Sequence, residues 1–168
     1  MKKTIIILLA VLMAAGASAQ LLDQGVSELR LSGLVDFETA DDTLFLLDVF
    51  YGIFLVDCFE AGLAMGLRES DSLSLWKIGA EAEYNFDLGT ELVPYIGGGL
   101  FYGRFDVDGK NDSGMIIKAA AGTKYFVTES VAISMAAVLE WASEDVYPEE
   151  GGLSDMDTRL ELGLRFFF

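Results

Sequence analysis

The sequence contains no histidine and only one cysteine, Cys58. Without histidine the chain lacks the commonest general base and the commonest transition-metal ligand, which excludes histidine-based catalytic triads and dyads. With one cysteine, no disulfide can form within the chain. We predict no catalytic residues, no metal site and no cofactor, and we interpret Cys58 as a small side chain at a turn.

Basic residues are also scarce. Lysine and arginine number 11 against 27 aspartates and glutamates, for a net charge of −16. Nucleic-acid binding requires a basic surface facing phosphates, so this charge balance excludes it. Because 52% of the residues are hydrophobic and 12% are aromatic, the chain is not expected to be disordered.

Long apolar runs are missing after residue 20. No stretch there approaches the ~18 uncharged apolar residues of a membrane helix, although hydropathy is high for a soluble protein. A hydrophobic, strongly charged chain without long apolar runs is typical of a transmembrane β-barrel, in which apolar and polar residues alternate.

The first residues resemble a secretory signal peptide. Lys2 and Lys3 precede an apolar stretch over residues 4–13, and Ala17-Ser18-Ala19 fits a cleavage site. The apolar stretch is too short to span a membrane, which takes about 20 residues. We therefore expect residues 1–19 to be a cleaved signal peptide and residues 20–168 to form one exported domain.

Eight segments have the length of strands, and most of them alternate with period two. From Phe59 to Leu67 the odd positions are apolar or small, whereas Glu60 and Arg68 lie at even positions. The predicted fold class is all-β, an eight-stranded antiparallel up-and-down transmembrane barrel. The segments are 27–38, 44–56, 59–68, 76–86, 93–107, 115–125, 131–141 and 158–168.

Two segments have a weak alternation. In the second, only the shared parity of Asp48 and Gly52 sets the phase, and we place both inward. The fifth is rich in glycine, and there we place Arg104 and Asp106 inward. The aromatic residues that this phase puts outward are Tyr95, Phe101 and Phe105.

With these phases every basic residue of the strands lies on the charged, inward face. A lipid-facing lysine or arginine at mid-bilayer would cost about 2–4 kcal/mol, so this placement is expected of a membrane barrel. An eight-stranded barrel is just wide enough for side chains to fill, and buried charges must pair, so we predict a mostly plugged interior. The candidates for interior ion pairs are Glu28, Arg30, Arg68, Lys77, Glu81, Lys118, Lys124, Glu140, Arg159 and Glu161.

The predicted connections alternate between compact turns and other loops. The turns are 57–58, 87–92 and 127–130, and the loops are 39–43, 69–72, 106–113 and 142–156. Short periplasmic turns and longer outer loops are the rule for membrane barrels. These outer loops carry twelve acidic residues and one basic residue, Lys110, and we interpret them as the surface through which the protein interacts.

Three stretches resemble the small eight-stranded outer-membrane β-barrels, a group that includes outer membrane protein X and the membrane domain of outer membrane protein A. They are residues 51–63 around the first turn, residues 93–99, and residues 160–168, which end on an aromatic residue. The resemblance implies a location in the outer membrane of a Gram-negative-type envelope, with outer-membrane lipid and the assembly machinery as partners. It also implies a C-terminal assembly signal at Leu162, Leu164, Phe166 and Phe168.

Four functions remain open on the sequence. A structural or surface-interaction barrel is favoured, and its surface ligand is not identified. A narrow, porin-like channel for ions or small solutes is the alternative. A soluble lipocalin-like barrel would have the opposite arrangement, with charges outside. A barrel enzyme is disfavoured by the lack of histidine, so we predict that the protein is not an enzyme.

Overall fold

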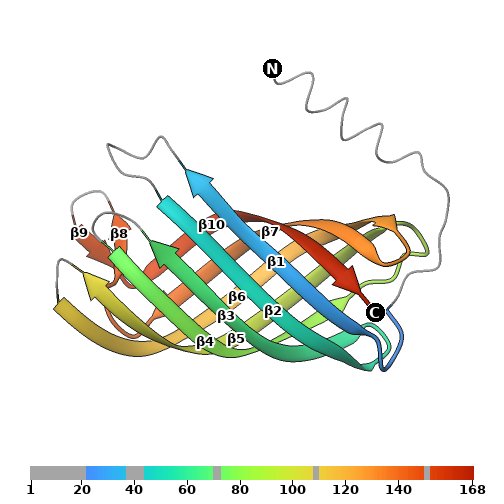
Figure 1. The fold of residues 1–168 in the computed structure, drawn as a ribbon, viewed down its shortest axis with the longest axis horizontal. Helices are drawn as coiled ribbons and strands as arrows, with labels where there is room; N and C mark the ends of the chain where they lie inside the picture. Colours follow the sequence, from blue (N-terminus) through green and yellow to red (C-terminus); the bar gives the residue numbers. More distant parts are fainter. Residues whose placement is uncertain (1–21, 37–43, 70–72, 108–109, 150–151) are drawn as a thin grey trace, which may run out of the picture.

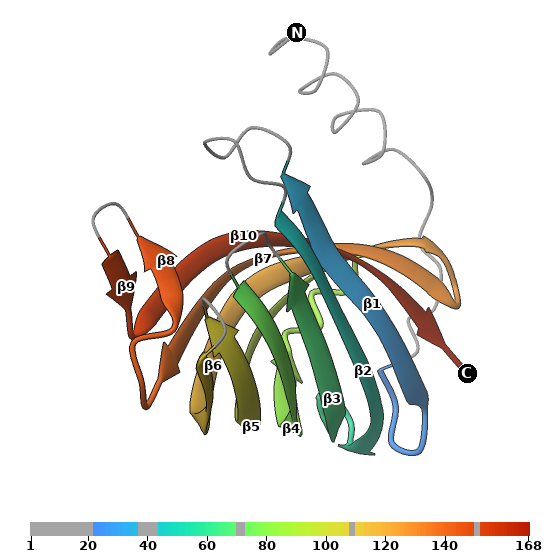
Figure 2. The same ribbon diagram turned by 60° about the vertical axis from the view of Figure 1, so that its left-hand side comes forward.

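The computed structural model describes residues 22–36, 44–69, 73–107, 110–149 and 152–168, and in them eight long strands form a closed antiparallel barrel (Figures 1 and 2). Each barrel strand pairs with its sequence neighbour, and the last strand closes the barrel against the first. This confirms the predicted fold class. No helix among these residues is long and apolar enough to cross a membrane. The barrel strands are β1 (Ser27–Asp36), β2 (Leu44–Val56), β3 (Phe59–Glu69), β4 (Leu73–Asn85), β5 (Leu92–Val107), β6 (Lys110–Thr128), β7 (Val131–Ala142) and β10 (Met156–Phe167).

Short turns join β2 to β3, β4 to β5 and β6 to β7 at one end of the barrel, which we call the turn end. The opposite end, the loop end, carries a small hairpin of β8 (Tyr147–Glu149) and β9 (Gly152–Ser154) between β7 and β10. The sequence predicted one loop over residues 142–156, whereas part of it pairs to form this hairpin.

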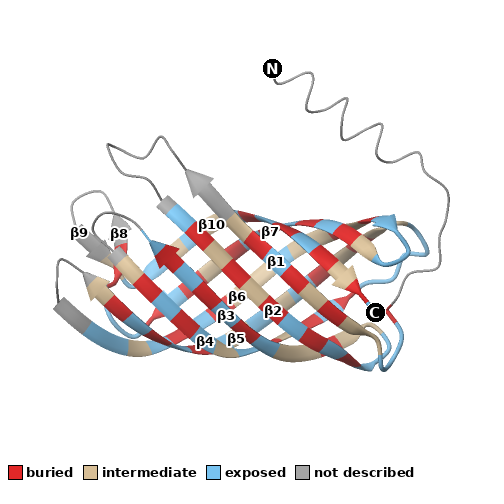
Figure 3. Cartoon of the chain, viewed as in Figure 1, coloured by how far each residue is buried: buried red, intermediate tan, exposed pale blue. Residues whose placement is uncertain are grey.

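Burial alternates along the strands as the sequence predicted (Figure 3). In β3 the Glu60 side chain is fully buried, whereas Leu63 is 69% exposed and Met65 is 55% exposed. Charged side chains therefore face the interior and apolar side chains face outward. This arrangement is the opposite of a lipocalin-like barrel, so that alternative is wrong.

The fifth strand contradicts the predicted phase. Tyr95, Phe101 and Phe105 are buried inside the barrel, and Arg104 is exposed on the outside. The reason lies in the inward glycines of the same strand. A Cβ on Gly99 would collide with the ring of Phe101, so the missing side chain leaves room for the ring inside. In β2, by contrast, Asp48 is buried as predicted.

The predicted loop over residues 106–113 is also wrong. β5 continues through Val107 and β6 begins at Lys110, with these two residues paired. Cross-strand pairing thus extends the β5–β6 hairpin at the loop end. The predicted signal peptide, the loop over residues 39–43 and the acidic residues Asp71, Asp108 and Glu150 lie outside the described residues.

Candidate functional site in the barrel interior

The interior is filled by a network of charged side chains that lies between two apolar layers. Alternation within each strand delivers these charges to the inside. The network contains seven basic and eight acidic side chains, so it is close to neutral. Burying so many charges is tolerable only if nearly all of them pair. The apolar layer at the turn end consists of Leu22, Phe54, Val93, Phe126, Ala132 and Phe167.

The part of the network nearest the turn end centres on Lys124, which has no exposed surface. Its Nζ lies 2.7 Å from Glu28 Oε2, 2.6 Å from Glu60 Oε1 and 3.3 Å from Glu83 Oε2. Arg165 adds a second cation, with Nη1 at 2.6 Å from Glu28 Oε1 and 2.8 Å from Glu83 Oε2. We call these five residues the turn-side cluster. They come from five different strands, so their pairs tie the barrel together across its interior.

Glu28, Glu60 and Glu83 offer three carboxylate oxygens within 4.8 Å of one another, a spacing that could hold a metal ion. The ammonium of Lys124, however, already lies within ion-pair distance of all three. A metal would have to compete with this lysine, so the arrangement is better described as a lysine bound by three carboxylates.

Arg30 connects the turn-side cluster to the ion pair of Glu81 and Lys118. Its guanidinium pairs with Glu83 of the turn-side cluster and with Glu81 one step further along β4. Lys118 binds Glu81 from the other side, with Nζ at 3.0 Å from Oε1. The Arg30 guanidinium also lies over the Phe50 ring, 4.8 Å from its centroid, so the connection is packed as well as paired.

The part nearest the loop end, the loop-side cluster, centres on Glu140 and Arg159. Lys77 Nζ lies 2.5 Å from Glu140 Oε1, and Arg159 Nη2 lies 3.0 Å from the same oxygen. Arg159 also pairs with Asp157 at 2.7 Å. The other members are Asp48, Arg68 and Glu161, with Ser32 donating to Glu161 Oε1 at 2.5 Å.

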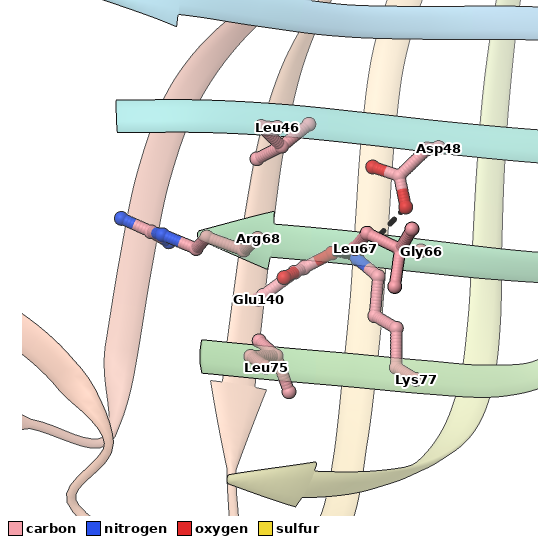
Figure 4. Close-up of a pocket in the computed structure, with 8 residues that line it drawn as sticks. All are labelled: Leu46, Asp48, Gly66, Leu67, Arg68, Leu75, Lys77 and Glu140. Atoms are coloured by element: carbon pink, nitrogen blue, oxygen red, sulfur yellow. Dashed lines mark hydrogen bonds and ion pairs between the residues drawn. The ribbon is translucent and has the colours of Figure 1, made fainter. Parts of the chain in front are cut away.

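A small pocket lies in this cluster beside Gly66 (Figure 4). Its volume is about 10 Å³, which is room for one water molecule at most. Asp48 and Lys77 meet across Gly66, with Lys77 Nζ at 3.2 Å from Asp48 Oδ1. A Cβ on Gly66 would overlap both side chains, so this ion pair depends on the glycine.

The loop end of the interior is covered by the start of the β8–β9 hairpin. Val146 and Tyr147 are buried in an apolar cluster with Phe105 and Ile116. The Tyr147 hydroxyl donates to Glu140 Oε2 at 3.2 Å, and the Arg68 guanidinium lies 5.4 Å from the ring centroid. Burial, reinforced by the negative charge of Glu140, raises the pKa of Tyr147 above its ordinary value. The tyrosine therefore stays neutral and acts as a cap on the polar network.

All ten residues that the sequence suggested for interior ion pairs lie in this network and make ion pairs there. Sequence reasoning did not select Asp48, Glu60, Glu83, Asp157 and Arg165. Glu60, Glu83 and Arg165 share the parity of selected residues on their strands, so the alternation could have identified them. Asp48 was placed inward but was not selected for an ion pair, and no selected residue lies on its strand. Asp157 was missed because the last strand begins at Met156, earlier than predicted.

No protein-family model and no curated protein matches the chain. Three solved structures share its fold. Neisserial surface protein A is 17% identical, with a TM-score of 0.60 over 85% of this chain and 95% of that one. A de novo designed transmembrane β-barrel is 13% identical, with a TM-score of 0.54 over 87% and 98%. The outer membrane protein OprG from Pseudomonas aeruginosa is 13% identical, with a TM-score of 0.51 over 86% and 92%.

These similarities confirm the fold that the resemblance implied, which is that of the small eight-stranded outer-membrane barrels. At these identities they concern the fold alone. The designed barrel is informative because it has no natural ancestry, so the shared architecture follows from strand alternation and closure.

Proposed function

We propose that this protein is an integral outer-membrane β-barrel with a closed interior, and that it works through its loop-end surface. The observation that carries the proposal is the outward face of the barrel. Large apolar side chains cover it around the circumference, and in water such a surface would drive aggregation. Members of this apolar belt include Ile53, Leu63, Met65, Ile78, Ile96, Leu100, Ile117, Met135, Leu160 and Leu162.

Three features of the interior support a closed barrel. The turn end is blocked by an apolar layer in which the Phe126 and Phe167 rings lie 4.9 Å apart. The centre is filled by paired charges, and the loop end is covered by Tyr147. A permeating ion would have to break several buried ion pairs. Breaking a buried pair is strongly unfavourable, because it leaves a buried charge without its partner. We therefore favour a closed barrel over the narrow channel.

The working surface that we propose is acidic. Around the loop end, Glu69, Asp112, Glu144, Asp145 and Asp155 are exposed. Loops on a rigid scaffold are the usual carriers of binding function. We propose a structural or interaction role for this surface and no enzymatic activity, since the chain has no histidine.

The experiment is fractionation, followed by electrophoresis of boiled and unboiled protein in detergent. We expect the protein in the outer-membrane fraction, with faster migration when it is not boiled. A soluble periplasmic protein without a mobility change would contradict the proposal.

Conductance in planar bilayers then separates a closed barrel from a channel. We expect the wild-type protein and the single variants Tyr147→Ala and Phe126→Ala to conduct little, because each single variant opens one end only. Steady conductance by the wild-type protein would establish the channel instead.

We also propose that the outward face of β10 is the signal read by the assembly machinery. Leu162, Leu164 and Phe168 are exposed on that face, and Phe166 is partly exposed. Deleting Phe168 is expected to lower the amount assembled in cells while refolding from urea into detergent stays efficient. Equal loss in both assays would assign these residues a purely structural role.

A further inference from the structure

The apolar belt is interrupted by one basic residue. Arg104 is exposed on the outward face of β5, and among the side chains whose burial the structure describes no other basic one faces outward. The outward positions of β5 change in character toward the loop end. Ile96, Leu100 and Tyr102 are apolar or aromatic, whereas Arg104 and Asp106 are charged. Arg104 therefore lies at the edge of the belt, where hydrocarbon gives way to polar surroundings.

The neighbours of Arg104 are those of a membrane interface. Trp76 lies opposite it on β4, and Ser113 lies opposite it on β6. A surface groove of about 250 Å³ is lined by Arg104 together with Tyr102, Asp112 and Ser113. Tryptophan and tyrosine concentrate at the level of lipid headgroups, because they combine an apolar ring with a polar group.

We propose that Arg104 and this groove bind the phosphate of a lipid headgroup in the outer leaflet. The inference rests on the proposed membrane location. An arginine on the lipid side costs about 2–4 kcal/mol at mid-bilayer and little near the interface. Its planar guanidinium can hold a phosphate through two parallel hydrogen bonds, which a lysine cannot match. Trp76 and Tyr102 then lie against the headgroup end of the same lipid.

The surrounding charge makes the site selective. The chain has a net charge of −16 and repels anionic lipid in general, so a preference for a phosphate group must come from a local cation. Asp112 lines the same groove and opposes an anion there. Removing the arginine and removing the aspartate should therefore change binding in opposite directions.

The two tryptophans of the chain provide matched reporters. In a Trp141→Phe background, Trp76 reports on the lipid beside Arg104. In a Trp76→Phe background, Trp141 reports from β7, where its cross-strand neighbours Ile117 and Met156 are apolar. Each protein is refolded into phosphatidylcholine vesicles that contain phosphatidic acid with brominated chains, which quench nearby tryptophans.

We expect quenching of Trp76 to exceed the value for randomly mixed lipids by about threefold to fivefold. This is the effect of one cation near an anionic lipid. Quenching of Trp141 should follow random mixing. Arg104→Gln should bring Trp76 to the random value, and Asp112→Asn should raise its quenching above wild type. Equal quenching of the two tryptophans, or an unchanged Arg104→Gln variant, would overturn the inference.

Two controls separate the possible failures. Brominated phosphatidylcholine should quench both tryptophans in every variant, and if it does not, the membrane location itself fails. Excess inorganic phosphate at matched ionic strength should leave the Trp76 preference intact. If the preference disappears, the groove binds free phosphate and not a lipid headgroup.

Discussion

Arg165 donates a hydrogen bond to Glu28 Oε1 over 2.6 Å, and neither side chain has any exposed surface. The two residues are 137 positions apart in the sequence. They lie on the adjacent strands β1 and β10, and each also contacts another member of the turn-side cluster.

Breaking this pair should destabilise the barrel strongly. Arg165→Met leaves Glu28 and Glu83 with fewer cations in a buried site. We expect the free energy of unfolding to fall by about 3–5 kcal/mol. Urea unfolding in detergent measures the change. Arg104→Gln removes an exposed charge and serves as the matched control, with an expected change within about 0.5 kcal/mol. Similar losses in the two variants would show that the buried network is not the source of the stability.

Gly66→Ala tests the packing of the loop-side cluster. The added methyl group would overlap Asp48 and Lys77, which must then separate. We therefore expect the free energy of unfolding, measured with urea, to fall by about 1–3 kcal/mol. Gly98→Ala is the control, because its Cβ would meet only the Lys118 carbonyl oxygen, at 3.2 Å, on the outward face. The prediction fails if both glycines tolerate alanine equally.

Tyr147 should make stability depend on pH in the alkaline range. Its pKa in the folded protein is raised by burial and by Glu140, so the folded state keeps a proton that the unfolded chain loses above about pH 10. This contribution is complete below that pH and is lost as pH rises further. Tyr147→Phe should cost about 1 kcal/mol at neutral pH. The difference from wild type should shrink above about pH 10, as measured by urea unfolding.

Cys58 occupies the turn between β2 and β3 with a φ of 65°, in the left-handed region. A residue with a side chain is disfavoured there by roughly 1–2 kcal/mol, whereas glycine is not. Cys58→Gly should therefore raise the unfolding free energy by up to about 1 kcal/mol. Cys58→Val should lower it, since a β-branched side chain tolerates this conformation least. A more stable valine variant would contradict this account of the turn.

The strands that could be predicted are those with strict alternation. In β3 and β10 one parity is apolar and the other carries the charges, so burial on one face fixes both the strand and its phase. The interior ion-pair candidates followed directly, because a charge on the inward parity has only other inward charges as partners.

The failure at β5 has a physical cause. Phe101 and Phe105 share a parity with Gly97, Gly99 and Gly103, and hydrophobicity alone assigns aromatic rings to the lipid side. Inside the barrel, however, the glycines leave space that the rings and the Glu81 and Glu83 side chains fill. The volumes of side chains on neighbouring strands determine which face of β5 points inward. The sequence of β5 alone does not contain that information.

The pairing of β1 with β10 runs only from Glu28–Phe167 to Gly33–Leu162, whereas β5 and β6 pair from Leu92–Tyr125 to Val107–Lys110. Every other pairing of barrel strands in the described residues joins strands that follow each other in the barrel and can zip up from their connection. The closing ladder must instead bring together segments separated by almost the whole domain, and loop-closure entropy makes such contacts slow to form. Closure is thus the expected rate-limiting step of folding, and a chain caught before it presents two unpaired edges to other molecules.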